Sequence, residues 1–134
     1  MKKILFILLL IVPLFSYAND DGLWFESSQI TFAKHGEDWE KPKPSRTRIY
    51  INLHDNIFEG IIMIYANKVV TLTLRKKVEK TENYIGSTYK WTFIDDNQNY
   101  GLCTVYMNND NTCQLLIAYD YGLYICYDMS PLIR

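Results

Sequence analysis

The chain has 134 residues, of which 14 are basic and 15 acidic, so its formal net charge is −1. This length fits a single domain with one core, and the near-neutral balance excludes nucleic acid as an expected partner because phosphate binding needs a concentrated basic surface. Eleven tyrosines and three tryptophans favour strands over helices.

Residues 1–18 have the three parts of a secretory signal peptide. A basic pair precedes the apolar stretch 4–15, and Ser16 and Ala18 place small residues before a cleavage point. Because twelve apolar residues are too few to cross a bilayer, which takes about 20, we expect cleavage rather than anchoring. The sequence predicts a bacterial periplasmic or secreted protein. Its mature domain, 19–134, carries 12 basic and 15 acidic residues, a charge of −3, and is not expected to insert into a membrane.

The predicted strands begin just after this segment. Short strands are expected at 22–25 and 29–33, followed by a long loop at 34–46. Beyond Thr47, apolar and polar residues alternate between runs of Asn, Asp and Gly, which is typical of antiparallel hairpins in series. The run 75–80 mixes lysines with acids and is interpreted as a solvated hairpin end.

The later strands can be paired through their turns. Loops are expected at 80–83, 96–98, 109–111 and 120–122, the last with Gly122 in the left-handed conformation. Each pairing keeps the apolar residues on one face, and a slip of one residue would turn them to solvent. The expected pairs include Leu74–Tyr89, Trp91–Cys103, Cys103–Ile117 and Ile117–Ile125.

These hairpins predict an all-β fold. We expect an antiparallel meander of about eight strands curled into a small closed or partly closed barrel, with a β-sandwich as the alternative. Six bulky side chains are expected to fill the interior and leave no large cavity: Tyr89, Trp91, Phe93, Met107, Tyr127 and Met129.

The same registers predict three free thiols. Cys103 and Cys113 face the core on neighbouring strands but are offset by four residues, or roughly 13 Å. A disulfide requires Cα atoms within about 7 Å. Cys126 points to the opposite face.

No catalytic residue, metal site or cofactor is expected. Asp95, Asn97 and Asn99 have the spacing that opens a calcium loop, but Tyr100 and Tyr106 stand where such a loop needs Gly and Glu. Turn formation explains these residues better.

The two histidines do not suggest a nucleophilic site either. His35 and His54 fall in predicted loops, whereas Cys103 lies in mid-strand and is expected to behave as a small apolar residue.

Two places could contact a partner. On the face opposite the core, pairing places apolar side chains in adjacent rows, which is unusual for a solvated sheet face. This candidate surface comprises Leu102, Tyr106, Leu116, Ala118, Tyr124 and Cys126. We expect it to be covered by the N-terminal strands, through Trp24, Phe25 and Phe32, or by another chain, including a second copy. In the long loop, His35 and Trp39 are candidate contacts.

Two sets of residues carry resemblances. Gly22-Leu23-Trp24 resembles the Gly-x-Trp that opens the first strand of lipocalin-like barrels. The segment from Trp91 to Met129, with its acidic turn, its Gly101-Leu102-Cys103 strand and a final aromatic hairpin, resembles small exported proteins of Bacteroidetes. The second resemblance implies an exported β protein and no particular activity.

These observations leave three functions open. The first is a non-catalytic protein-binding module, the second a lipocalin-like carrier of a small apolar ligand, and the third an enzyme inhibitor acting through the 34–46 loop. An internal cavity would favour the carrier, and a rigid protruding loop would favour the inhibitor.

Overall fold

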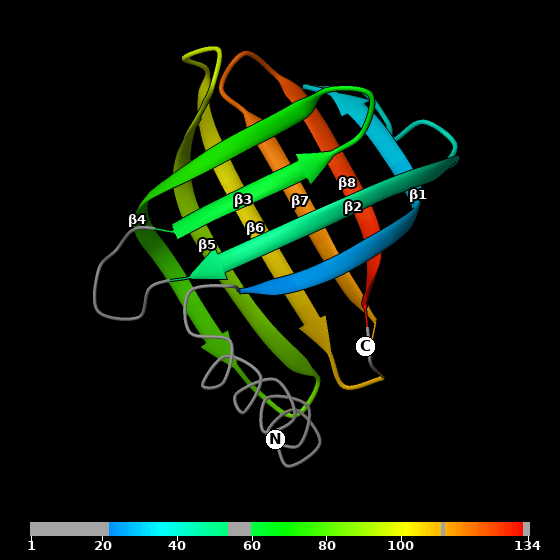
Figure 1. Ribbon diagram of the computed structural model, residues 1–134, viewed down its shortest axis with the longest axis vertical. Helices are drawn as coiled ribbons and strands as arrows, with labels where there is room; N and C mark the ends of the chain where they lie inside the picture. The colour runs from blue at the N-terminus through cyan, green and yellow to red at the C-terminus, as the bar shows by residue number, and fades with distance from the viewer. Residues whose placement is uncertain (1–21, 54–59, 111, 133–134) are drawn as a thin grey trace.

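In the computed structural model, which describes residues 22–53, 60–110 and 112–132, the chain forms a closed antiparallel barrel (Figure 1). Each strand pairs with the next along the chain, and β8 returns to pair with β1. The predicted all-β meander of eight strands is therefore confirmed, and the barrel is closed. The strands are β1 (Leu23–Lys34), β2 (Lys43–Leu53), β3 (Gly60–Tyr65), β4 (Val69–Glu82), β5 (Gly86–Asp95), β6 (Tyr100–Asn108), β7 (Cys113–Tyr119) and β8 (Leu123–Pro131).

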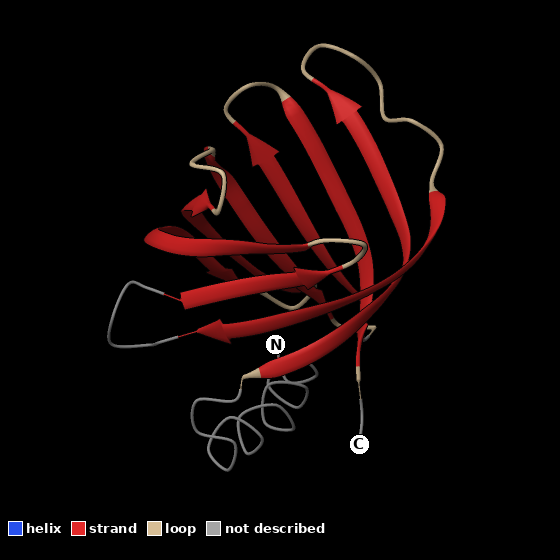
Figure 2. Cartoon of the chain, turned by 45° about the horizontal axis from the view of Figure 1, so that its top comes forward, coloured by secondary structure: helices blue, strands red, loops and turns tan. Residues whose placement is uncertain are grey.

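Several expectations fall outside this description. The signal segment 1–18 and His54 lie among residues that the structure does not describe. Figure 2 shows that the described elements are strands joined by loops. Within them, no helix is long and apolar enough to cross a membrane.

The expectation of two short N-terminal strands is wrong, because this part of the chain forms the single strand β1. The chain runs unbroken from Leu23 to Lys34, with a bulge between Ser27 and Gln29 that shifts the pairing with both neighbours. Phe25 and Ile30 are five residues apart, so in a regular strand they would face opposite sides. The bulge brings both into contact with the core. That break in alternation is what made one strand look like two.

The predicted register between β4 and β5 is wrong. Leu74 pairs with Phe93, not with Tyr89. The pairing already differs next to the turn, where Tyr89 lies opposite Lys80. Two register shifts in β4, between Leu74 and Lys76 and between Lys77 and Glu79, then change the pairing by one residue each. The main source of the error is the turn itself, which lies at 83–86 and not at the predicted 80–83.

The three later hairpins have the predicted registers. Trp91 pairs with Cys103, Cys103 with Ile117, and Ile117 with Ile125. Gly122 has φ of 101°, as the predicted turn requires. These hairpins contain no register shift, so period-two alternation was a sufficient guide to them.

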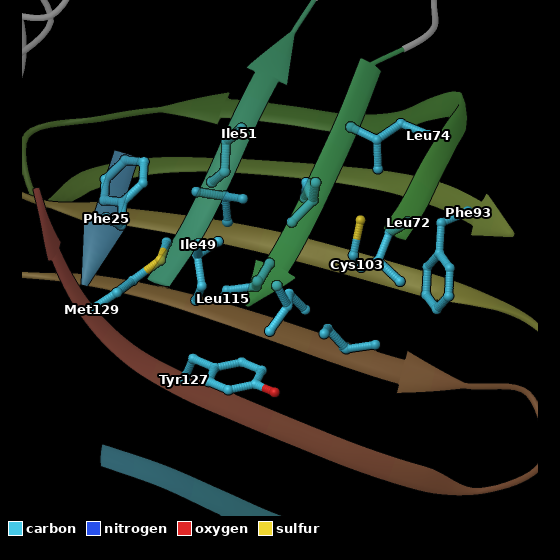
Figure 3. Packing of buried hydrophobic residues seen from close by; sticks show 14 of the residues in the cluster. Phe25, Ile49, Ile51, Leu72, Leu74, Phe93, Cys103, Leu115, Tyr127 and Met129 are labelled. Carbon is cyan, nitrogen blue, oxygen red and sulfur yellow. The ribbon is translucent and has the colours of Figure 1, made fainter. Parts of the chain in front are cut away.

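Side chains from all eight strands meet inside the barrel (Figure 3). Four of the six bulky residues expected there are buried, and Tyr89 and Met107 pack against them while partly exposed. The buried apolar cluster consists of Phe25, Ile49, Ile51, Ile62, Ile64, Leu72, Leu74, Trp91, Phe93, Cys103, Val105, Cys113, Leu115, Ile117, Tyr119, Tyr127 and Met129.

Leu115 provides a direct test of this packing. It is fully buried on β7, so Leu115→Ala should lower the free energy of unfolding by about 2–5 kcal/mol in a denaturant titration. The matched change Thr73→Ala on the outer face of β4 should cost less than about 0.5 kcal/mol. Equal losses from the two variants would contradict the assignment of inner and outer faces.

The three cysteines are free, as the registers predicted. Cys103 and Cys113 are buried, and Cys126 is half-buried on the outer face. We therefore expect the melting temperature to be unchanged by a reductant and mass spectrometry of unreduced protein to find three thiols per chain. An intact Cys103–Cys113 bridge would be incompatible with the β6–β7 register.

Candidate interaction surface

The outer face of β6, β7 and β8 carries the predicted rows of apolar side chains. Pairing places Leu102 opposite Ala118 and Ala118 opposite Tyr124. The next row joins Leu116 to Cys126. Leu102 is 38% exposed and the other four are half-buried, whereas Thr104, which lies opposite Leu116, is buried. These neighbouring strands therefore present a largely apolar surface to solvent.

Strand β1 lies beside this surface, not over it. Ala33 and Thr31 extend the two rows through their pairing with Tyr124 and Cys126. The expected cover by the N-terminal strands is therefore wrong, because closure of the barrel uses β1 as the neighbour of β8.

The aromatic residues expected to form that cover lie elsewhere. Phe25 is in the core, and Phe32 pairs with Ile125 within the barrel wall. Trp24 lies against Tyr50 and Tyr65, with ring centroids 5.0 and 5.4 Å apart. Those tyrosines are on β2 and β3, away from the rows on β6–β8.

The loop 35–42 brings the second set of predicted residues to the same surface. His35 Nδ1 lies within hydrogen-bonding distance of the Tyr124 hydroxyl, at 2.9 Å. The Trp39 ring is 6.5 Å from the Tyr124 ring, measured between centroids, and is 48% exposed. Two sets of candidate residues that the sequence suggested separately therefore meet at Tyr124. We call Trp39, Leu102, Leu116, Ala118, Tyr124 and Cys126 the outer patch.

Backbone hydrogen bonds hold this loop against the barrel. The His35 amide donates to the Gly122 carbonyl at 2.7 Å, and the Glu40 amide donates to the Phe32 carbonyl at 2.8 Å. Gly36 turns the chain with φ of 80°, a conformation that favours glycine. The loop is shorter than the predicted 34–46 because β2 already begins at Lys43.

Tyr106 is less closely associated with the patch than predicted. It lies in a third row, where the Gln114 side-chain amide donates to the Asp128 carboxylate at 2.8 Å. That row is polar, so Tyr106 marks the edge of the apolar surface.

Tyr100 is an exposed aromatic residue that the sequence analysis missed. It begins β6 two residues before Leu102, which places both side chains on the outer face, and it is 56% exposed. Extending the period-two alternation backwards by one step would have found it.

The thiols are poor nucleophiles. Burial raises the pKa of Cys103 to about 12, and burial together with the nearby Asp128 carboxylate raises the pKa of Cys126 to about 11. Since the thiolate is the reactive form, little of either is reactive at neutral pH. Cys103 also faces the core while His35 lies in an outer loop, so these two residues do not form a nucleophile–base pair. His54 lies outside the described residues.

The carboxylate of Asp95 is engaged in turn formation. Its Oδ1 accepts hydrogen bonds from the amides of Asn97 at 2.9 Å and Asn99 at 2.8 Å. This is the turn chemistry that the sequence favoured over a calcium loop. Across the described ranges, no group of three His, Cys, Asp or Glu side chains could hold a metal ion.

Comparison with known proteins identified no relative of this chain. No family model, curated protein or solved structure matches the chain. The resemblances to lipocalin-like barrels and to exported Bacteroidetes proteins remain predictions, and the outer patch must be interpreted from its own residues.

The raised thiol pKa values predict a loss of stability at alkaline pH. An ordinary thiol has a pKa of 9.0, whereas the pKa is about 12 for Cys103 and about 11 for Cys113 in the folded protein. Each of these thiols therefore contributes its full stabilisation of the folded state below pH 9. That contribution is lost as pH rises from 9 towards the folded values, by up to about 1.4 kcal/mol per pH unit for each thiol. Denaturant unfolding at pH 8 and pH 10.5 should reveal the loss, and Cys103→Val should reduce it. A pH dependence identical in wild type and Cys103→Val would contradict the assignment.

Proposed function

We propose that this protein is a non-catalytic protein-binding module that is exported from a bacterial cell and contacts its partner through the outer patch. The observation that carries the proposal is the contact of Trp39 with Tyr124, from separate elements, in the row that also holds Ala118 and exposed Leu102. Aromatic residues dominate the energetics of protein interfaces because they bury a large area with few rotatable bonds. A contiguous exposed apolar surface on a small domain is typical of an interaction site.

Two features favour this function over the alternatives. The carrier needs internal space, whereas the cluster inside the barrel draws side chains from all eight strands. The inhibitor needs a loop that projects into a cleft, whereas the backbone of loop 35–42 is hydrogen-bonded back to Phe32 and Gly122. A filled interior and a loop held against the barrel are both compatible with a protein that binds its partner on the outside of the barrel.

The first test asks whether the partner is a second copy. Sedimentation equilibrium of the wild type, Leu102→Asp and the control Thr73→Asp measures the oligomeric state. Both substituted positions are exposed on outer faces, so both variants should fold. A dimer that only Leu102→Asp dissociates would identify the outer patch as a contact between copies, because the new carboxylate would have to be buried unpaired.

If the wild type is a monomer, the partner is a different protein. Peptides selected from a displayed random library against the wild type should carry apolar or aromatic anchors. Their dissociation constants should rise at least about tenfold for Leu102→Asp, corresponding to about 1.4 kcal/mol, and change little for Thr73→Asp. A monomeric wild type that selects no peptide sensitive to Leu102→Asp would overturn the proposed function.

A further inference from the structure

One row of residues inside the barrel carries three sulfur atoms. Met107 on β6 lies directly opposite Cys113 on β7, and Cys113 lies directly opposite Met129 on β8. Cys113 and Met129 are buried, and Met107 packs against the core while partly exposed. Figure 3 shows the Met129 side chain extending into the interior. Within the described ranges, the methionines that contact the core are these two, and they flank the same thiol.

The pairing allows the three sulfur atoms to converge on one point. Residues directly opposite each other on neighbouring strands have Cβ atoms about 4.5–5.5 Å apart. Cys113 has the shortest side chain and occupies the middle of the row. The methionines on either side are long and unbranched, with three rotatable bonds each. Their thioethers can therefore reach over the central thiol from both sides, as three ligands around one ion require.

A buried hydroxyl beside the row has no hydrogen-bond partner. Ser87 on β5 lies opposite Met107 and is 1% exposed, and its Oγ is unpartnered among the described residues. Ser27 extends the row on the other side, opposite Met129, and is also buried, but its hydroxyl donates to the Gln29 carbonyl at 3.0 Å. Buried polar groups nearly always have a partner, and an exception indicates a water, an ion or a ligand that belongs at the site.

The softness and the charge of these ligands select one kind of metal ion. Thiolate and thioether sulfur are soft ligands, which favour Cu(I). One thiolate and two neutral thioethers carry a single negative charge, so a monovalent ion forms a neutral unit with them, and a neutral unit is the one that burial tolerates. Zn²⁺ would leave a positive charge in the core, and its usual ligands are thiolate, imidazole and carboxylate.

The acidic residues of this region do not supply the charge that a divalent ion would need. Asp95 is the buried carboxylate of the described chain, and it lies at the end of β5 remote from Ser87. Asp110, on the turn next to Cys113, is exposed to water, which screens its charge. A monovalent soft ion is therefore the occupant that the row fits.

We propose that Met107, Cys113 and Met129 form a three-coordinate binding site for Cu(I). On binding, the S–H bond of Cys113 breaks, its proton passes to solvent, and a Cu–S bond forms with no change in the oxidation state of copper. Met107 is partly exposed near the end of β6, so the ion enters from the rim of the barrel and not through its packed centre. The site faces inside, so it goes beyond the proposed function and does not rest on the outer patch.

The thioethers are tested by anaerobic titration of the purified exported protein with Cu(I), in competition with the chromophoric chelator bicinchoninate. The wild type should bind one Cu(I) per chain. Met107→Leu and Met129→Leu nearly conserve side-chain volume, so both variants should fold, and each should raise the dissociation constant at least about tenfold. The control Met63→Leu removes a half-buried thioether from the outer face of β3 and should change the constant by less than about twofold.

The thiol is tested with a matched pair of buried cysteines. Cys113→Ala should abolish the binding of one equivalent of Cu(I). Cys103→Ala also removes a buried thiol, but Cys103 lies opposite Trp91 and Ile117 and has no methionine beside it in its row. Its dissociation constant should stay within about twofold of the wild-type value. Because both variants remove the same side chain from the core, an effect of weakened packing alone would appear in both.

X-ray absorption at the copper edge identifies the ligands directly. The loaded wild type should show three sulfur neighbours and no nitrogen, and an excess of Zn²⁺ should not displace the copper. The proposal would be overturned by a wild type that binds no Cu(I), by methionine variants that bind as the wild type does, or by equal losses in the two cysteine variants. Nitrogen ligands, or displacement by Zn²⁺, would overturn it too. None of these results bears on the outer patch, which the Leu102 variant tests.

Discussion

The backbone hydrogen bonds between β1 and β8 are the interaction on which the rest of the structure depends. They join the first strand to the last and turn an open meander into a barrel with no edge along β1 or β8. Closure also fixes an inside and an outside for every residue of every strand. The apolar cluster fills the inside, and each residue that alternation places outside must meet water or a partner.

The candidate surface follows from that closure. Had β1 crossed the outer face of β6–β8, it would have buried Leu102 and Tyr124, and the patch would have been ordinary core. Because β1 pairs with β8, this face is left to loop 35–42 among the described residues, and the loop contributes Trp39 and His35. The result is a surface that is partly covered by the chain itself and still substantially apolar.

The sequence predicted much of this fold and failed where the backbone departs from regular alternation. The hairpins from Trp91 to Met129 contain no bulge, so side-chain pattern and turn chemistry fix their registers. The bulges near Ser28, Arg75 and Val78 each insert a residue without a clear signal in composition. The β4–β5 register was wrong chiefly because the turn lies three residues later than predicted. The pairing of β1 with β8 could not be predicted from turns and alternation, because the two strands lie almost a whole chain length apart in the sequence.

The candidate site was predictable to the same extent. The rows on β6–β8 follow from the regular hairpins, and Tyr100 could have been added by the same alternation. The contact of loop 35–42 with Tyr124 could not be predicted, because it joins residues 89 positions apart in the sequence and depends on barrel closure.

Closure can be tested through a native cysteine. Thr31 on β1 lies directly opposite Cys126 on β8 on the outer face, and such pairs have Cα atoms about 4.5–5.5 Å apart, within the range of a disulfide. Under mild oxidation with copper phenanthroline, the variant Thr31→Cys should form an intramolecular bridge to Cys126, identified by peptide mass mapping. Phe32→Cys, one residue along and paired with Ile125, should not. A Thr31→Cys variant that stays reduced while remaining folded, or a bridge formed by Phe32→Cys instead, would contradict a barrel closed by β1 and β8 in this register.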